Sequence, residues 1–376
     1  MRLDIEVQAL LVRARDLYPE NLEISHQLAR MTGPVRVAVD GKPNTGKSTL
    51  LDALTGTDGF QFVVDSPDAV IYLMRHVHAT DVSALEAAQD QAVARATRMN
   101  TVAVLAHADE IGAGRLDAMI SARQIARRYA ADERLRGLCQ TVVPVAGLLA
   151  RTASTLRPDE FDVLARLAGL PRAEVDPWLL SADRARTLSI PDALVDRLGM
   201  FGIRLGVTLV RGGFGEPRLL AAELVRRSGL DDLRDQLTVH FGARARLLKA
   251  RSGLITLDRA LPRDDRTVTL LVDVERLIAG AHEFAEVRLL DALRAGSIQV
   301  PDGIQADVER LLGAHGVTVG SRLGLPDNTK AQRDAALATL GDWQRRAENP
   351  LSSRQFAHAA RVIVRTCEGL LSELAG

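Results

Sequence analysis

The stretch VAVDGKPNTGKSTLLDALTG, residues 37–56, is the clearest indication of the fold class. Within it, Gly41 to Ser48 fit the pattern G-x-x-x-x-G-K-[ST], and they stand between a β-rich run and a helical segment. Glycines let the backbone curl so that successive N–H groups point inward, and the helix that follows adds the positive end of its dipole. The stretch therefore predicts a loop that binds phosphate groups, because a plain glycine-rich turn would not require Lys followed by Ser.

Two side chains carry the chemistry of this predicted loop. Lys47 supplies a positive charge for the β- and γ-phosphates of a nucleotide, and Ser48 offers its hydroxyl to Mg²⁺, which neutralises charge on the phosphoryl oxygens. Lys47 and Ser48 are therefore the predicted catalytic residues, with Ser48 also a metal ligand. The predicted nucleotide-binding residues of the segment are Gly41, Lys42, Pro43, Asn44, Thr45, Gly46, Lys47, Ser48 and Thr49.

The identity of the base depends on a later strand. Guanine-binding proteins of the Ras-like kind end that strand with Asn/Thr-Lys-x-Asp, whose carboxylate accepts two hydrogens from the guanine edge. In TVAVLAHADEIG, Asp109 stands at the carboxylate position, whereas His107 and Ala108 replace the amide or hydroxyl and the lysine. After the next strand, Ala146 and Gly147 stand where backbone groups contact the guanine oxygen. His107, Asp109, Ala146 and Gly147 are therefore predicted base-site residues, and the open alternative is that Asp109 only caps a helix.

Short β-rich runs alternate with helical segments between residues 34 and 155. Continuous apolar strands that alternate with helices indicate a mostly parallel sheet with helices on both faces. Residues 34–155 therefore predict an α/β phosphate-loop domain. The runs are VRVAVD (35–40), FVVD (62–65), AVIYLMR (69–75), TVAVLAH (101–107) and TVVPVA (141–146).

The interval between the second and third runs is unusually short. Asp65 in FVVDSP resembles the aspartate of a D-x-P-G element that orders Mg²⁺ through water, so Asp65 is a candidate metal residue. Only three residues separate Asp65 from Ala69, whereas a parallel crossover needs about ten or more. Either the two runs form an antiparallel hairpin, or nucleotide-sensing loops are missing near Gly59–Phe60 and Pro67–Asp68, where the chain is then expected to break.

The first thirty-three residues predict two helices. Apolar side chains recur at steps of four and three from Leu3 to Leu17, which places them on one helix face. A second helix is expected from Pro19 to Met31, closed by Gly33 in the left-handed capping conformation.

Strand signals nearly vanish after residue 155, so residues 156–376 predict an elongated all-helical bundle. One long helix is expected over residues 228–261, starting near Asp231 or Asp232. The most apolar helical segment, residues 198–210, predicts a buried core helix rather than a membrane anchor.

The last helix is expected to begin at a capping box of Ser352 and Gln355. Its apolar seam consists of Phe356, Ala360, Ile363, Cys367, Leu370 and Leu374. Because helices with matching seams can pair, residues 1–33 are expected to pack with the C-terminal helices of the bundle. The alternative is that each seam packs on its nearest neighbour.

The charge balance, the cysteines and the hydropathy of the chain argue against several classes of function. The 48 basic and 48 acidic residues cancel, so there is no bulk attraction to nucleic acid or to an anionic bilayer. Cys139 and Cys367 are far apart and lack metal-ligand spacing, so neither a disulfide framework nor a zinc site is predicted. No signal peptide and no run of about 18 uncharged apolar residues is present. A cytoplasmic protein with at most peripheral membrane contact is expected.

Several blocks of the sequence resemble one family. GKPNTGKSTLLDALTG resembles bacterial GTPases of the Era and dynamin-like groups. The blocks ADEIGAGRLDAMIS, VVPVAGLLA, RLGMFGIRLGV, AAELVRRSGLDDLRDQL and LLKARSGLITL resemble the isoniazid-inducible dynamin-like proteins of mycobacteria. The resemblance runs from about residue 30 to the C-terminus. It implies a GTPase domain on a helical neck and trunk, Mg²⁺-dependent GTP hydrolysis promoted by self-association, and membrane remodelling or fission at the inner face of the plasma membrane.

The resemblance also bears on single residues. It implies a Mg²⁺-ordering role for Asp65 and a guanine contact for Asp109. Asn44 falls where related enzymes place a side chain that helps bind a monovalent cation, although a turn-stabilising Asn is the alternative.

The departures at His107 and after Pro67 leave two other functions open. One is a nucleotide-binding scaffold, or pseudo-GTPase, that serves an active dynamin-like partner. The other is a soluble Era-like regulatory GTPase, although the basic surface of an RNA reader is missing here. The expected partners are thus a guanine nucleotide, an anionic lipid membrane and other GTPase domains in a homo- or hetero-oligomer, and no nucleic acid.

Overall fold

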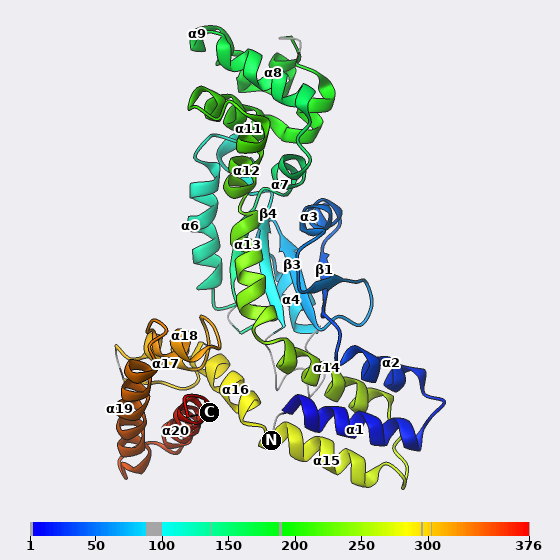
Figure 1. Ribbon diagram of the computed structural model, residues 1–376, viewed down its shortest axis with the longest axis vertical. Helices are drawn as coiled ribbons and strands as arrows, with labels where there is room; N and C mark the ends of the chain where they lie inside the picture. Colours follow the sequence, from blue (N-terminus) through cyan, green and yellow to red (C-terminus); the bar gives the residue numbers. More distant parts are fainter. Residues whose placement is uncertain are drawn as a thin grey trace.

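A five-stranded sheet lies at the centre of an elongated molecule (Figure 1). The computed structural model describes residues 3–87, 100–135, 137–187, 190–294, 296–301 and 303–375. The strand order is β2-β1-β3-β4-β5, and every neighbouring pair is parallel. The strands are β1 (Val35–Gly41), β2 (Phe60–Phe62), β3 (Ala69–Met74), β4 (Thr101–Ala106) and β5 (Val142–Val145). The predicted α/β class is confirmed.

Helices cover both faces of the sheet because its strands are apolar on both sides. Adjacent residues of β3 face opposite sides of the sheet. Ile71 packs in the core with α3 (Lys47–Leu54) and α13 (Leu230–Leu237). Tyr72 packs in the core with α4 (Ala79–Ala87) and α6 (Ala118–Ala130). The carboxyl end of β1 therefore meets α3 directly, and this junction holds the phosphate loop.

The connection between β2 and β3 contradicts one of the two expectations. β2 and β3 flank β1 and are both parallel to it, so the predicted antiparallel hairpin is wrong. The alternative, that nucleotide-sensing loops are missing near Gly59–Phe60 and Pro67–Asp68, stays a prediction.

The register explains how so short a connection suffices. Phe62 at the end of β2 and Ala69 at the start of β3 both pair with Val37. The chain therefore crosses β1 without travelling back along a strand, and needs to cover only about two strand spacings, roughly 10 Å. Asp68 ends the crossing: its N–H donates to the carbonyl of Arg36 (2.8 Å), and its carboxylate accepts from the N–H of Arg36 (3.0 Å).

Helices that follow the sheet share a core with it. α7 (Gly147–Ser154), α8 (Pro158–Gly169), α11 (Asp192–Arg211) and α12 (Pro217–Ser228) pack in one cluster with β3 and β4 residues. Three short elements lie between α8 and α11: α9 (Arg172–Val175), η2 (Trp178–Leu180) and α10 (Ala182–Thr187). Residues 198–210 lie in α11 and are largely buried, so they form a core helix as predicted. The domain boundary at residue 155 stays a prediction.

The long helix predicted over residues 228–261 is interrupted. It consists of α13, a π-helical turn at Thr238–Gly242 and α14 (Ala245–Ala260). The interruption changes the buried face, because Leu233 of α13 faces the sheet whereas Leu254 of α14 faces the N-terminal helices.

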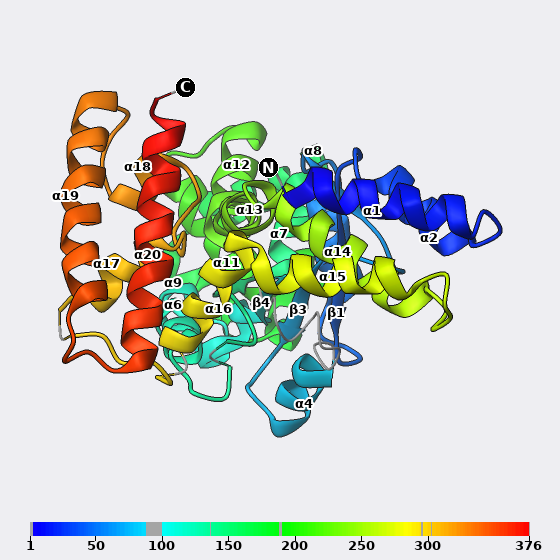
Figure 2. The same cartoon turned by 90° about the horizontal axis from the view of Figure 1, so that it is seen from below.

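The two chain ends pack on different partners. α1 (Leu3–Leu17) and α2 (Leu22–Arg30) join a core with α14 and α15 (Val268–Gly280). α20 (Arg354–Glu373) joins a separate core with α16 (His282–Arg294), α17 (Gln305–Leu311) and α19 (Thr329–Glu348). α18 (Val319–Leu323) lies between the last two in sequence. Figure 2 shows α1 and α20 on opposite sides, so the expected pairing of the terminal seams is not found.

Two predicted caps are also wrong. α2 ends at Arg30 with Met31 in a right-handed conformation, so Gly33 is not a left-handed cap. α20 is capped by Ser353, whose Oγ accepts from the N–H of Phe356 (3.1 Å), rather than by Ser352.

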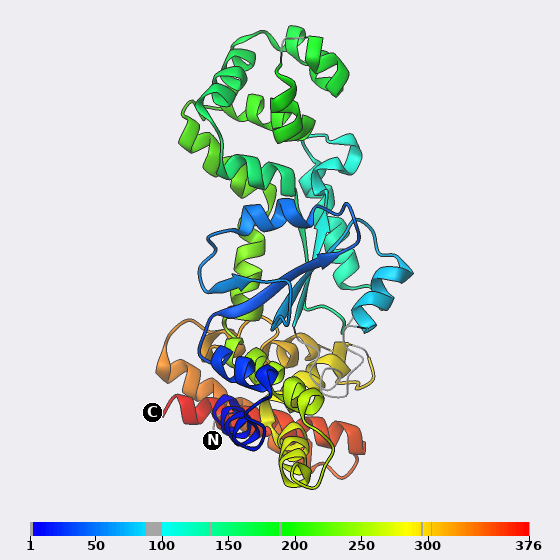
Figure 3. The same ribbon diagram turned by 90° about the vertical axis from the view of Figure 1, so that its right-hand side faces the viewer.

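The molecule thus has three tiers. Figure 3 shows α8 to α12 at one end, the sheet in the middle, and the N- and C-terminal helices together at the other end. Among the described helices, none is both long and apolar enough to cross a membrane.

Candidate phosphate-loop site

The phosphate loop joins β1 to α3, where the sequence predicts it. Gly41 has a φ of 139°, and a Cβ there would lie only 2.4 Å from the carbonyl oxygen of Leu73 on β3. Gly46 caps α3 with a φ of 90°, and Asn44 has a φ of 61°. Asn tolerates this left-handed conformation better than most residues, which supports the turn role of Asn44. The cation role of Asn44 stays a prediction.

The ammonium group of Lys47 lies against the loop. Its Nζ donates to the carbonyl oxygens of Gly41 and Lys42, the latter at 2.9 Å. The hydroxyl of Thr45 donates to the same Lys42 carbonyl at 2.8 Å. Ser48 is exposed in the first turn of α3. The ammonium group of Lys47 is therefore bound by the loop backbone, whereas the hydroxyl of Ser48 is exposed to solvent.

Sequence reasoning missed a buried carboxylate behind the loop. Asp81 of α4 is only 1% exposed, and it accepts from Lys42 Nζ (2.9 Å), the hydroxyl of Tyr72 (3.1 Å) and the N–H of His78 (3.2 Å). Burial, together with the charge of Asp81, raises the pKa of Tyr72. The position of Asp81 three residues after His78 at a helix start is typical of a capping-box acid, and this was the available signal.

The loop opens into a cavity of about 170 Å³ at the carboxyl edge of the sheet. The cavity brings together six residues that the sequence predicts for nucleotide binding. These are Thr45, Gly46, Thr49, His107, Asp109 and Gly147. Leu50, Leu73, Val104, Ala106, Glu110, Val145 and Leu148 complete its lining. Ligand sites of open α/β sheets lie at this edge.

Asp109 lines this cavity from the 3-10 helix η1 (Ala108–Ala113). Burial raises the pKa of the Asp109 carboxyl, and the charge of Glu110 raises it further. A largely desolvated carboxylate of this kind binds strongly to paired N–H donors, because such bonds are charge-assisted. The base-reading role of Asp109 stays a prediction.

His107 lines the cavity between Asp109 and the phosphate loop. It takes a left-handed φ of 54°, and its Nε2 lies 3.8 Å from where a Cβ on Gly46 would stand. Its ring nitrogens contact Glu110 Oε1 (2.7 Å) and the guanidinium of Arg75 (2.9 Å). No pattern in the sequence indicated a role for Arg75, which directly follows β3.

Ala146 and Gly147 differ in what they can offer to a base. The N–H of Ala146 donates to the carbonyl of Ser228 (2.9 Å), and Ala146 is fully buried. Gly147 lines the cavity at the start of α7. Of the two residues, only Gly147 lines the cavity, and the predicted backbone contact to a base stays a prediction.

The structure does not bring Asp65 to Ser48. Asp65 is exposed in the β2–β3 connection, and β2 ends level with Val37. Val37 lies four residues before Gly41, a separation of about 13 Å along a strand.

The position of Asp65 follows from where β2 stops. If the pairing of Phe62 with Val37 continued residue by residue, Asp65 would stand level with Asp40, beside the loop. The N–H of Val63 still donates to the carbonyl of Val37 (2.9 Å), but the chain then turns away. It turns there because it must enter β3 at the same level.

A Mg²⁺ ion fits these residues only in part. Ser48 offers one hydroxyl at the loop, and Mg²⁺ commonly completes its shell with water and the phosphates of its substrate. Within the described residues there is no group of three or more His, Cys, Asp or Glu side chains that could hold a metal by itself.

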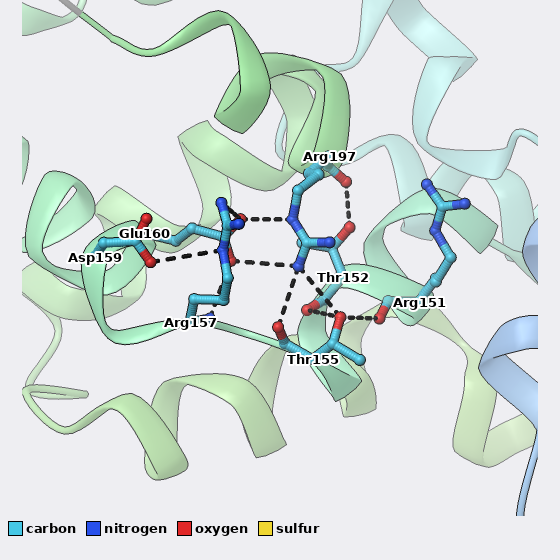
Figure 4. Close-up of polar contacts among 7 residues, drawn as sticks. All are labelled: Arg151, Thr152, Thr155, Arg157, Asp159, Glu160 and Arg197. Carbon is cyan, nitrogen blue, oxygen red and sulfur yellow. Dashed lines mark hydrogen bonds and ion pairs between the residues drawn. The ribbon is translucent and has the colours of Figure 1, made fainter.

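A polar network fixes the helices behind the cavity (Figure 4). Glu160 of α8 is 2% exposed and accepts from the guanidinium groups of Arg197 (2.5 Å) and Arg157 (3.1 Å). Arg197 also donates to Thr155 at the end of α7 (3.1 Å), and its carbonyl accepts from Thr152. The network joins α7, whose first turn lines the cavity, to α8 and α11.

A parallel sheet with a glycine-rich loop between β1 and α3 and a cavity at its carboxyl edge defines an α/β protein of the phosphate-loop class with a large helical extension. The isoniazid-induced protein IniC of Mycobacterium tuberculosis, from strains CDC 1551 / Oshkosh and ATCC 25618 / H37Rv, is 36% identical to this chain over 382 residues. The alignment covers 99% of this chain and 74% of the relative. The chain therefore belongs to the family of IniC, the isoniazid-induced dynamin-like proteins of mycobacteria. No family model matches the chain, and no solved structure matches it.

Proposed function

We propose that this chain is a dynamin-like GTPase that binds GTP with Mg²⁺ at Gly41–Ser48. The observation that carries this proposal is the single cavity shared by the phosphate loop and Asp109. Thr45 and Gly46 bring the loop to this cavity, Lys47 lies beside them without lining it, and the half-buried Asp109 also lines it. A phosphate loop and a carboxylate on one cavity suit a triphosphate and a guanine edge, respectively. Mg²⁺, when bound through Ser48 and the phosphates, would supply charge neutralisation at the transferred phosphoryl group.

The helical extension supports the mechanical part of the proposal. Helices α8 to α12 share a core with the sheet, and the polar network of Glu160 and Arg197 ties them to α7 at the cavity. Nucleotide-dependent changes at the cavity can thus reach the helices, which we propose act on an anionic membrane surface. Self-association through the GTPase domain would promote turnover, as in other large GTPases.

A nucleotide-binding scaffold without turnover is the second candidate. The exposed position of Asp65 favours it, because the carboxylate that would order Mg²⁺ lies away from Ser48. Such a scaffold would bind the same nucleotide and serve an active partner.

Phosphate release separates these candidates. We expect the protein to release phosphate from GTP more readily than from ATP, and anionic vesicles to increase the rate. Lys47→Ala removes the loop ammonium and is expected to reduce nucleotide affinity and turnover by about a hundredfold or more. Lys330→Ala, which changes an exposed lysine on α19, is the matched control. GTP binding without turnover would support the scaffold, and no binding of any guanine nucleotide would contradict both candidates.

A further inference from the structure

Three successive residues after the base-side carboxylate have left-handed backbone conformations. Gly112, Ala113 and Gly114 have φ values of 63°, 61° and 68°. A left-handed conformation at a non-glycine residue such as Ala113 costs on the order of 1 kcal/mol, and it persists only where the surroundings hold it. Something must therefore hold this turn in place.

Arg204 of α11 binds the turn. Its NH1 donates to the carbonyl oxygens of Ala113 (3.2 Å) and Gly114 (2.5 Å). The same guanidinium donates from Nε to Leu179 O (2.6 Å) and from NH2 to Leu180 O (2.9 Å). One rigid side chain therefore joins the turn after Asp109 to the 3-10 helix η2.

Gly114 lies close to both the guanidinium of Arg204 and the backbone of Asp109. A Cβ on Gly114 would lie 3.4 Å from Arg204 NH1 and 3.4 Å from the carbonyl oxygen of Asp109. The absence of a side chain at Gly114 therefore lets the guanidinium of Arg204 approach the backbone of Asp109.

We propose that Arg204 is a positioning residue of the base site, which holds the turn that directs Asp109 into the cavity. It also couples base binding to η2, since it binds both segments with one guanidinium. Trp178 and Leu180 of η2 expose 38% and 63% of their surface, so the coupled segment presents apolar side chains to solvent. The base-binding part of this inference rests on the proposed function, whereas the coupling between the two segments does not.

Arg211 provides a matched control on the same helix. It also donates to main-chain carbonyls, those of Leu167 (3.3 Å), Ala168 (3.1 Å) and Leu170 (3.0 Å) at the end of α8. These carbonyls lie outside the turn after Asp109. Arg204→Lys and Arg211→Lys therefore each replace a planar fork by a single ammonium while keeping the charge.

The test combines hydrogen exchange with nucleotide affinity. In Arg204→Lys we expect faster amide exchange in both residues 108–117 and residues 178–182 without nucleotide; Asp176, which forms an ion pair with Arg211 (3.7 Å), lies outside the second window. We also expect GDP affinity to fall about tenfold, with a smaller change for ADP. Arg211→Lys should change neither. Gly114→Ala, which leaves α11 intact, should repeat the exchange change in residues 108–117 if Arg204→Lys fails to fold.

The outcomes separate this inference from the proposed function. Unchanged exchange in residues 108–117 of Arg204→Lys would overturn the inference, whether or not GDP binds. Equal losses of GDP and ADP affinity would also overturn it, because a general packing defect does not discriminate between bases. If the unmodified protein binds no GDP but the exchange pattern is as expected, the proposed function fails and the coupling stands.

Discussion

The phosphate loop and the β2–β3 connection both lie beside β1, yet they are held very differently. The loop is fixed from within: Lys47 binds two of its carbonyls, and Gly41 packs against the backbone of β3. The connection is fixed at its end by Asp68, whereas Val64 in its middle is 90% exposed. The conformation of the phosphate loop is therefore fixed by residues near it in sequence. The position of Asp65 depends instead on how the chain crosses β1 between β2 and β3.

This difference shows which residues of a binding site can be positioned from the sequence immediately around them. Residues 41–48 form their own contacts, so the strand and helix beside them fix their position. Asp65 reaches the phosphate loop only if β2 continues three residues further. The residues next to Asp65 in sequence do not determine where β2 ends. We expect the loop to be sensitive to small changes and the connection to tolerate them.

The largest expected effect comes from filling the space at Gly41. A Cβ in Gly41→Ala would lie 2.4 Å from Leu73 O, and φ is 139°, so the loop or β3 must shift. We expect the free energy of unfolding to fall by about 2 to 4 kcal/mol, with nucleotide binding lost. Chemical denaturation and a GDP titration measure the two effects.

Gly59→Ala is the matched control for this change. Gly59 also has a positive φ, 83°, but a Cβ there would meet no atom within 4 Å. The cost should be the backbone strain alone, about 1 kcal/mol, with nucleotide binding retained. Equal costs at the two positions would contradict the claim that close packing holds the loop.

A smaller effect is expected from pH at the base side. Only the ionised carboxylate of Asp109 can accept two hydrogens from guanine, and burial raises its pKa above the ordinary value of 3.8. GDP affinity should therefore fall as the pH drops through this raised pKa, by about tenfold per pH unit below it. Calorimetric titration of GDP between neutral and acid pH measures this.

Asp109→Asn is the control for the pH effect. We expect it to bind GDP weakly, with an affinity that no longer follows the protonation of this residue. His107, Glu110 and Arg75 face the same carboxyl, so only the part of the pH dependence that is lost in Asp109→Asn is assigned to Asp109. If Asp109→Asn keeps the full pH dependence, Asp109 is not the base reader.

The sequence predicts the parts of this molecule that depend on short-range patterns. Four of the five strands and the phosphate loop follow from apolar runs and from the spacing of glycines around Lys47. The run predicted over residues 62–65 is wrong, because β2 spans Phe60–Phe62 and the chain turns away after it. The cavity follows from the carboxyl ends of parallel strands. The π-helical turn at Thr238–Gly242 was not predictable, because it depends on two different packing partners for α13 and α14. The contacts of Asp81 and Arg204 were missed for the same reason, since each joins segments that are distant in sequence.

The smallest expected effect is at Asp65. Because Asp65 is exposed and lies level with the first half of β1, Asp65→Asn should change Mg²⁺-dependent phosphate release by no more than about twofold. Asp58→Asn, at an exposed aspartate just before β2, is the matched control and should behave alike. A loss of tenfold or more in Asp65→Asn alone would show that β2 extends in the working protein until Asp65 stands level with Asp40. In that case the connection would be the mobile half of the site, ordered only when nucleotide and Mg²⁺ are bound, and the scaffold candidate would lose the observation that favours it.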